Sequence, residues 1–454
     1  MTADRSRRAL ALLLFINLFN YVDRQVLAAV VPSIEKSFFG EANGAARSAA
    51  LEALQQWCRA RLGFKPELAL IGVLSMAFMV LYMVGAPVFG RLAESHSRWG
   101  LVGVGVIGWS LASGASGLAT TFFGLLLTRC LVGIGEAAYG PVAPTILSDL
   151  YAVEVRGRVL AWFYMAIPVG SALGYVLGGA VAGSTIGDLG GRIIGIHAES
   201  WRWAFFLVVP PGLLLGALAF FMKDPALGRG KRVAAARPDR IRWRDYGVLL
   251  RTPSWVACTL GMTAMTFAIG GIAFWMPYYL ARRPGAPAST TVVFGGITCV
   301  AGLLATLAGG VAGDRLRSRF SGSYFLVSGT AMIVGFPFLL LTLSAPFPLI
   351  WIWLFVTCFC LFFNTGPTNT ILANVSHPSI RAAGFALNIL LIHAFGDVLS
   401  PVVIGVVSDR YSMHLAFVVV GAMFVIAGIL WLAGARYLER DTALVEARLA
   451  RAAP

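Results

Sequence analysis

The sequence predicts an all-α membrane protein with twelve transmembrane helices, arranged as two pseudo-symmetric bundles of six. Of its 454 residues, 58% are hydrophobic and 13% are charged, about half the charged share of an average soluble domain. The mean hydropathy is +0.78. Apolar segments recur along the whole chain, each close to the length of about 20 residues that spans a bilayer. The fold class follows from these observations.

Six apolar segments precede a polar, basic stretch, and six more follow it. We therefore expect an N-terminal bundle over residues 1–222, a cytoplasmic linker over 223–254, and a C-terminal bundle with its tail over 255–454. The spans are expected near residues 9–31, 68–92, 100–119, 121–147, 158–183, 202–222, 255–281, 291–313, 322–343, 347–375, 380–407 and 413–436. In the first outer loop, residues 49–62 predict an amphipathic helix, to which the sequence assigns no function.

A formal net charge of +15 is compatible with binding to nucleic acid. The basic residues lie in short runs between apolar segments, however, a distribution that reflects membrane topology and not a DNA-binding face. About two dozen of the 36 lysines and arginines fall in the N-terminal tail, the linker, the C-terminal tail and the loops on the same side. By the positive-inside rule, both termini and the linker are cytoplasmic. Arginine greatly outnumbers lysine, which is typical of a GC-rich bacterial genome. We expect a monomer in a bacterial inner membrane. Its expected partner is the lipid bilayer, and no binding of nucleic acid is expected.

Several other classes of function are excluded or disfavoured. The six cysteines show neither CxxC nor framework spacing, so neither a disulfide scaffold nor a metal site is expected. The dipeptide Gly230-Lys231 lacks the spacing of a phosphate-binding loop, which excludes an ATP-driven transporter. The stretch Gly114 to Gly117 has the serine pattern of rhomboid proteases, but small residues are common in membrane helices. We expect no enzyme.

Two charges, Arg129 and Glu136, lie in the apolar segment of residues 125–144. They are seven residues apart, so they leave the same face of a helix about 10 Å apart along its axis. An ionisable side chain inside a bilayer costs several kcal/mol, at least about 2.5. The pair therefore lines a transport or ion pathway, or it forms a structural polar cluster that fixes helix packing.

The two predicted halves resemble each other. Gly140-Pro141 is echoed by Gly366-Pro367, and the loop GRLAESHSR (Gly90–Arg98) by GVAGDRLRSR (Gly310–Arg319). A duplicated six-helix unit joined by a basic loop is the architecture of major facilitator transporters, which bind their substrate between the halves.

Beyond this architecture, the chain resembles the Spinster branch of the major facilitator superfamily over nearly its whole length. Five pieces carry the resemblance, in order: NYVDR (Asn20–Arg24), MVGAPVFGRLAE (Met83–Glu94), LLLTRCLVGIGEAAYGPVAPTILSDLY (Leu125–Tyr151), FYMAIPVGSALGYVLGG (Phe163–Gly179) and IHAFGDVLSPVVIGVVSD (Ile392–Asp409). In one loop the chain departs from the superfamily pattern, because Glu94 stands where an aspartate is usual.

The resemblance implies transport of lysolipids, such as lysophospholipids or sphingosine-1-phosphate, by alternating access. It also implies proton coupling through Asp23, Arg24, Arg129 and Glu136, with the proton gradient as the energy source and no cofactor. The alternative is a major facilitator carrier for small organic anions or drugs, since charges in a cavity suit any anionic substrate.

Helix geometry constrains how these four residues meet. Asp23 and Arg24 are adjacent and project about 100° apart, so one alone can point squarely at Glu136. We expect Arg24 near Glu136 or the substrate, and Asp23 near Arg129. Burial favours a neutral carboxyl group, and a neighbouring arginine favours an ionised one. A proton or an anionic headgroup then decides which arginine is free to bind a phosphate.

Further residues are assigned to the cavity and to a cytoplasmic gate. His393 and Asp397 share one helix face, as a second proton-handling pair, as headgroup contacts or as a packing contact. The predicted substrate cavity comprises Arg24, Arg129, Glu136, Asn20, Phe267, Phe274, Asn364, His393 and Asp397. The predicted gate comprises Gly90, Glu94, Arg98, Arg156, Asp314 and Arg315, for which solvated loop charge is the alternative.

Overall fold

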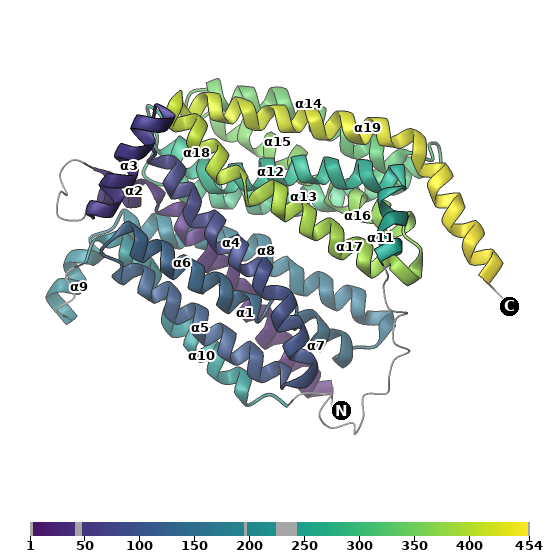
Figure 1. The fold of residues 1–454 in the computed structure, drawn as a ribbon, viewed down its shortest axis with the longest axis horizontal. Helices are drawn as coiled ribbons and strands as arrows, with labels where there is room; N and C mark the ends of the chain where they lie inside the picture. The colour runs from purple at the N-terminus through teal and green to yellow at the C-terminus, as the bar shows by residue number, and fades with distance from the viewer. Residues whose placement is uncertain (1–2, 41–47, 195–197, 224–242, 453–454) are drawn as a thin grey trace. The chain divides into compact units, whose positions relative to one another are not determined.

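The structure is a computed structural model that describes residues 3–40, 48–194, 198–223 and 243–452. Every regular element in these ranges is a helix, as the composition predicts (Figure 1). Most of the predicted basic linker, residues 224–242, lies outside the described ranges. The predicted division into residues 1–222 and 255–454 stays a prediction.

By its internal contacts the chain forms two compact units, and each is described here by itself. The first unit contains residues 1–232, 274–296 and 401–410, and the second contains 233–273, 297–400 and 411–454. The first unit therefore includes the end of α12, the beginning of α13 and all of α18 except its first residue.

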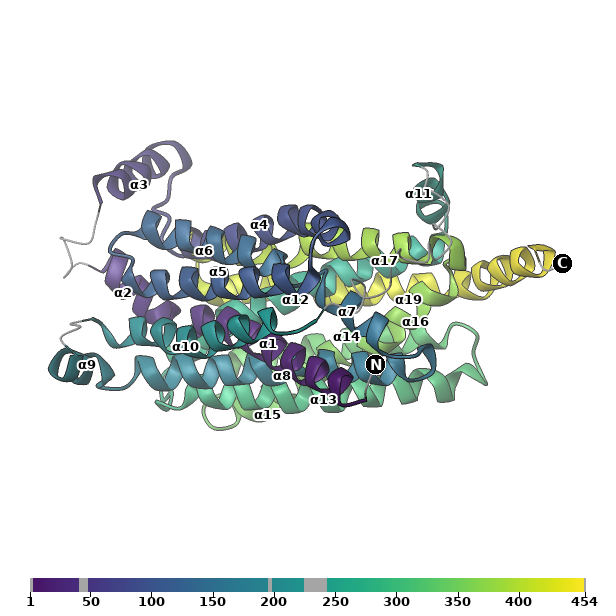
Figure 2. The same ribbon diagram turned by 90° about the horizontal axis from the view of Figure 1, so that it is seen from below.

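Among its described residues, the first unit contains seven longer helices and three short ones, besides its parts of α12, α13 and α18 (Figure 2). Within it α1 packs against α8, α5 against α10, and α4 against α6. The helices are α1 (Ala3–Ala29), α2 (Val31–Phe39), α3 (Ala49–Leu62), α4 (Leu68–Ser95), α5 (Arg98–Leu118), α6 (Phe122–Ala137), α7 (Ala143–Leu150), α8 (Val153–Ala182), α9 (Ile186–Ile194) and α10 (Ser200–Phe220).

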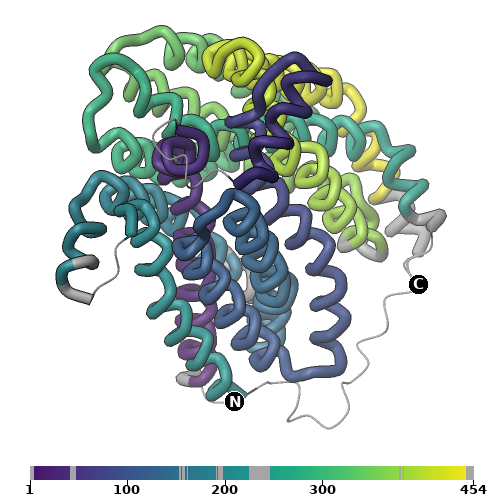
Figure 3. Tube along the Cα trace, turned by 60° about the vertical axis from the view of Figure 1, so that its left-hand side comes forward, coloured from purple at the N-terminus to yellow at the C-terminus, as the bar shows by residue number. Residues whose placement is uncertain are grey.

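The remaining helices follow in chain order and are coloured teal to yellow in Figure 3. In the second unit α14 packs against both α15 and α19. The helices are α11 (Trp243–Leu250), α12 (Pro253–Ala281), α13 (Thr290–Arg317), α14 (Ser323–Ser344), α15 (Ile350–Phe362), α16 (Thr365–Asn374), α17 (Pro378–Ile392), the π-helical turn His393–Asp397, α18 (Ser400–Arg410) and α19 (Met413–Ala452).

Eleven helical segments of the described chain are long and apolar enough to cross a membrane. The one remaining predicted span, the fourth in chain order at residues 121–147, was expected to be continuous, and the structure corrects this. It breaks into α6 and α7 at residues 138–142, so neither piece reaches spanning length alone. The predicted span 347–375 breaks at the corresponding place, between α15 and α16. With the interrupted pair α6 and α7 added to the eleven, the described chain contains the twelve segments that the sequence predicts.

A ladder of glycines explains the close contact of α8 with α1. A Cβ atom added at Gly170 would lie 2.4 Å from the carbonyl oxygen of Leu18, and one at Gly174 would lie 2.5 Å from that of Val22. Small residues at such spacing let two membrane helices approach backbone to backbone. The ladder holds α1, which carries half of the central charges, in place.

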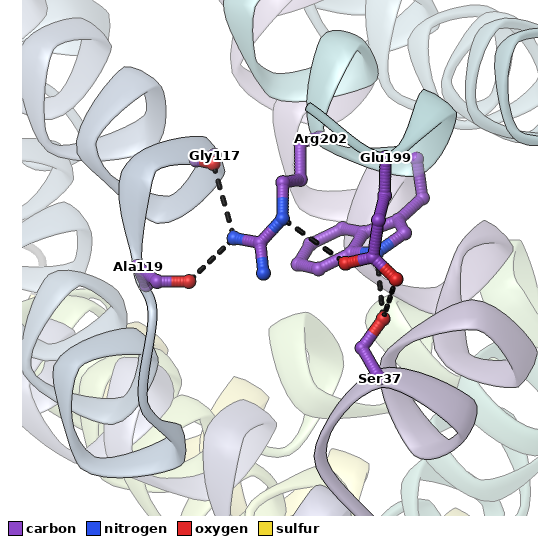
Figure 4. A network of polar contacts seen from close by, with 6 residues as sticks. Ser37, Gly117, Ala119, Glu199 and Arg202 are labelled. Atoms are coloured by element: carbon purple, nitrogen blue, oxygen red, sulfur yellow. Dashed lines mark hydrogen bonds and ion pairs between the residues drawn. The ribbon is translucent and has the colours of Figure 1, made fainter. Parts of the chain in front are cut away.

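The ends of α2, α5 and α10 are tied together by polar contacts at the side predicted to face outward (Figure 4). Arg202 donates to the carbonyl oxygens of Gly117 and Ala119 and, 3.2 Å away, to the carboxylate of Glu199. Ser37 donates to the same carboxylate at 2.6 Å. These bonds satisfy the last carbonyl groups of α5, which have no partner inside the helix.

The predicted amphipathic helix of the first loop is present as α3, with the bounds expected from the sequence. Ser48 caps its first turn, accepting a hydrogen bond from the backbone N–H of Leu51, and Gly63 ends it with a φ of 77°. A left-handed residue at this position is the commonest way to end a helix, and glycine adopts it without strain.

Candidate functional site

The charges on α6 lie next to the break that ends this helix. Arg129 and Glu136 are each 1% exposed, and Glu136 is the penultimate residue of α6. Its backbone carbonyl accepts hydrogen bonds from Tyr139 and Gly140 in the turn. The C-terminus of a helix carries partial negative charge, which attracts a cation and disfavours a second negative charge. The break thus creates a place that holds an arginine well.

That arginine is Arg24 of α1. Its Nε and Nη2 atoms both lie 2.7 Å from Oε2 of Glu136, in an ion pair between two helices. The Arg24 side chain remains 16% exposed, while that of Glu136 is fully covered. Breaking such a buried pair by removing one partner typically costs about 3–5 kcal/mol. Of the two places predicted for Arg24, near Glu136 or near the substrate, the structure shows the first.

Asp23, the neighbour of Arg24 in the chain, is 2% exposed. Ser113 of α5 donates a hydrogen bond to its Oδ1 atom. Beside it lies a cavity of about 10 Å³, lined by side chains of α1, α5 and α10 that include Ser113 and Trp109. This volume suits about one water molecule. Asp23 also interacts electrostatically with Arg129, its predicted partner.

Several charged atoms at this centre lack hydrogen-bond partners within the described chain. They are Oδ2 of Asp23, Nε and Nη1 of Arg129, and Oε1 of Glu136. Buried polar atoms are normally satisfied, so each exception needs an explanation. The two acids and two arginines balance in charge, and their spare donors and acceptors are free for protons, water or a ligand.

In the second unit, His393 and Asp397 form the contact predicted from their spacing. Nδ1 of His393 lies 2.9 Å from Oδ2 of Asp397. They span a π-helical turn in which the N–H of Val398 bonds to the carbonyl of His393. A single π turn inside a helix is frequent at functional sites. A Cβ at Gly270 of α12 would lie 2.7 Å from that of Asp397, so α12 approaches the pair closely.

The other predicted cavity residues are buried. Asn20 on α1 is 3% exposed and lies one turn before Arg24. Asn364 precedes α16 and donates to the carbonyl of Leu361 at 2.8 Å. Phe267 belongs to the second unit and is 9% exposed, whereas Phe274 belongs to the first and is 6% exposed. The structure does not bring these two phenylalanines into one unit.

The predicted gate residues differ in their surroundings. Arg98 is 4% exposed and forms a 2.7 Å ion pair with Asp149, near the end of α7. Asp314 accepts a hydrogen bond from Tyr324 at 2.8 Å. Three further predicted gate positions, Gly90, Glu94 and Arg315, are half-buried or exposed. The side chain of Arg156 lies outside what the structure describes.

Sequence reasoning did not single out several residues that touch the central charges. They are Ser113 and three aromatic side chains around Arg24 (Tyr21, Phe78 and Tyr82). Asp149, which pairs with the gate residue Arg98, was not singled out either. A serine or an aromatic residue in an apolar segment gives no signal of its own. Asp149 was detectable, because it is an acid inside the long piece Leu125–Tyr151 that carries the family resemblance.

A second polar cluster lies in the first unit, on the side predicted to face outward. Glu35 of α2 accepts a hydrogen bond from Tyr278 at 3.0 Å and forms an ion pair with Arg282. Burial raises the pKa of Glu35 above its usual value, against the opposing effect of Arg282. Asp409 accepts hydrogen bonds of 2.8–3.0 Å from three consecutive backbone N–H groups at the start of α4. The side of the unit opposite the predicted gate is therefore held by these bonds.

A search of the described residues finds no group of three or more His, Cys, Asp or Glu side chains that could hold a metal ion. The centre that stands out is therefore one of charge and aromatic rings, inside membrane-spanning helices. Such a centre suits binding and proton transfer.

Comparisons with known proteins agree with this architecture. The family model described as Major Facilitator Superfamily matches residues 13–396. A solved bacterial homolog of the human lysosomal transporter Spinster, in an inward-facing and unoccupied conformation, has a TM-score of 0.82 with 19% identity. That match covers 97% of this chain and 99% of the other. A D-xylose-proton symporter shares the fold, with a TM-score of 0.69, 16% identity and coverage of 93% and 96%.

Sequence relatives narrow the family. Human protein spinster homolog 1 is 35% identical over 434 residues, which are 90% of this chain and 74% of the relative. The zebrafish (Danio rerio) sphingosine-1-phosphate transporter SPNS2 is 30% identical over 470 residues, covering 96% of this chain and 85% of the relative. The chain therefore belongs to the Spinster family of the major facilitator superfamily and is a multi-pass membrane transporter, not an enzyme.

Proposed function

We propose that this transporter moves lysophospholipids or related amphiphilic lipids by alternating access, coupled to protons. One observation carries the proposal: a buried carboxylate, Glu136, is paired with an arginine, Arg24, that remains partly accessible. A transported lipid with an anionic phosphate competes with Glu136 for this guanidinium. The relatives add support, since one of them is a sphingosine-1-phosphate transporter.

The ion pair works as a switch, because the guanidinium of Arg24 binds either the carboxylate of Glu136 or the phosphate of the substrate. When Glu136 takes up a proton, its charge disappears and Arg24 is released. The guanidinium then binds the phosphate of the substrate through two parallel hydrogen bonds. Loss of the proton to the other side of the membrane restores the pair and expels the phosphate. The burial of Glu136 favours its neutral form and the arginine opposes it, so small changes decide the outcome.

Arg129 and Asp23 form the second half of the centre. Arg129 is fully buried with two nitrogen atoms unpaired, so it attracts an anion that enters beside Arg24. Asp23 balances this charge and, through Ser113 and the small cavity, provides a second position for a proton. We also propose substrate contact for the other residues that the sequence assigned to it, namely His393, Asp397, Asn20, Asn364, Phe267 and Phe274.

We propose that the predicted gate residues hold the cytoplasmic side closed in one conformational state. In that state the ion pair between Arg98 and Asp149 ties the start of α5 to α7. We place the protein in a bacterial inner membrane as a monomer with cytoplasmic termini and without a cofactor. The proton gradient supplies the energy, since a potential of 100 mV is worth about 2.3 kcal/mol per charge.

Uptake into proteoliposomes tests the substrate class. Purified protein is reconstituted, and uptake of labelled lysophospholipids is compared with uptake of dicarboxylates and cationic dyes, with and without a pH gradient. Uptake of lysophospholipids that accelerates with the gradient is the expected result. Preferred uptake of dicarboxylates or dyes would replace the proposal by a carrier for small anions or drugs.

A further inference from the structure

Three aromatic rings surround the guanidinium of Arg24. Its Cζ atom lies 4.9 Å from the ring centroid of Tyr21, 5.0 Å from that of Phe78 and 5.1 Å from that of Tyr82. All three distances fall within the range of about 6 Å for cation–π attraction. With the carboxylate of Glu136 as a fourth wall, these side chains form what we call the Arg24 box.

The backbone makes room for the box. Phe78 and Tyr82 lie one turn apart on α4, with their rings inclined by 25° and centroids 6.5 Å apart. A Cβ added at Gly133 would lie 2.3 Å from the carbonyl oxygen of Phe78, and one at Gly140 would lie 2.3 Å from the hydroxyl of Tyr82. Glycine at these two positions therefore allows α6 and its turn to approach the aromatic face of α4.

The box is partly exposed. Phe78 is 5% exposed and forms its inner wall. Tyr21 and Tyr82 are half-buried, and the Arg24 side chain is 16% exposed. A ligand can therefore reach the rings without unfolding the core, once Arg24 moves aside.

We propose that the Arg24 box is the binding site for the quaternary ammonium group of a zwitterionic lysolipid headgroup. Without substrate, the guanidinium of Arg24 occupies the position of that ammonium group. This inference rests on the proposed function and names the headgroup that the site prefers. Arg24 leaves the box to bind the phosphate once Glu136 is protonated, and the ammonium group takes its place between the three rings, beside the neutral Glu136.

Charge balance and hydration favour this exchange. One cation leaves the box as another enters, and the phosphate accompanies the departing arginine, so the zwitterionic lipid adds no net charge and the centre gains only the proton that Glu136 has taken up. A guanidinium is only weakly hydrated, and rings that accommodate it suit another broad, weakly hydrated cation such as trimethylammonium. A primary ammonium group is compact and strongly hydrated, and three aromatic walls do not replace its water. The box therefore prefers choline to ethanolamine.

Headgroup selectivity tests the inference. Uptake rates are measured in proteoliposomes for three lysolipids with one acyl chain and choline, ethanolamine or glycerol headgroups. In the wild type, choline is expected to be the fastest. Tyr82→Leu, which removes a ring, is expected to lower the choline-to-glycerol ratio about five- to tenfold. Tyr82→Phe, which keeps the ring, is expected to preserve the ratio.

Controls separate a headgroup site from a structural support. Tyr21→Leu removes a different wall, so it is expected to lower the ratio as well, even if one variant folds poorly. Tyr411→Leu removes an aromatic side chain that is 71% exposed and is expected to leave the ratio unchanged. Equal losses for all three headgroups in both box variants would overturn the inference.

Calorimetry with glycerophosphocholine, which has the headgroup without an acyl chain, distinguishes the two levels of the proposal. Binding that is lost in Tyr82→Leu and kept in Tyr82→Phe supports the box, even if no lysolipid is transported and the proposed function falls. Absence of binding, together with transport that does not depend on the headgroup, would refute the box and leave the proposed function standing.

Discussion

Arg24 is the residue on which the centre depends, because its planar guanidinium contacts a carboxylate and three rings at once. Arg24→Lys keeps the positive charge but removes the fork of donors and the flat surface. We expect lysolipid uptake to fall by at least about tenfold, the effect of roughly 1.4 kcal/mol, while the protein stays folded. Initial uptake rates and gel filtration in detergent measure this, and wild-type rates would contradict it.

Glu35 gives a prediction about pH. Its folded pKa lies above the usual 4.5, because burial outweighs the attraction of Arg282. The contribution of Glu35 to stability is therefore fully present below pH 4.5 and is lost as pH rises through the raised pKa. Glu35→Gln is neutral at every pH. Its melting temperature should equal that of the wild type at acidic pH and exceed it at neutral pH. Thermal melts over this range measure the difference, and a variant that melts below the wild type at neutral pH would refute the prediction.

At this scale the sequence identified the four central charges, because ionisable residues are conspicuous in apolar segments. From the angle between neighbouring residues on a helix, it predicted that one of Asp23 and Arg24 can point at Glu136, and it placed Arg24 near Glu136 or near the substrate. It did not find Ser113 or the three rings, since serine and aromatic residues are ordinary members of membrane helices and their contacts arise between helices.

At the scale of elements, the break after α6 positions Glu136, and sequence reasoning missed it. The Gly-Pro pair at residues 140–141 was noticed as a repeat, and proline lacks the N–H that a helix needs. Proline alone does not predict a break, however, because Pro87 and Pro168 lie inside the long helices α4 and α8. The helix that ends at this break packs against α4 and α5, and the sequence does not specify that packing.

The start of α4 offers a test of one helix end. Asp409 caps three N–H groups there, so Asp409→Ala is expected to destabilise the protein by about 0.5–2 kcal/mol, as for other caps. Asp409→Asn keeps one acceptor oxygen and should lose less. Denaturant unfolding in detergent gives the free energies, and hydrogen exchange of the amides of residues 67–69 should quicken in the alanine variant. Unchanged exchange there would show that the cap is dispensable.

For the whole molecule, composition and periodicity predicted the fold class, and the charge distribution predicted an orientation that stays a prediction. The amphipathic helix at residues 49–62 was also predicted with correct bounds. Contact between segments far apart in the chain was not predictable. The grouping of residues 274–296 and 401–410 with the first unit depends on contacts such as that of Trp275 with the carbonyl of Pro401, 2.9 Å away.

Proton movement driven by the lipid tests the central claim most directly. Proteoliposomes containing a pH-sensitive dye receive a lysophospholipid without an imposed gradient, and the internal pH is followed for the wild type and Glu136→Gln. The account predicts a pH change in the wild type that scales with lipid uptake and is absent in Glu136→Gln, although that variant remains folded. Proton movement in Glu136→Gln equal to that of the wild type would contradict it.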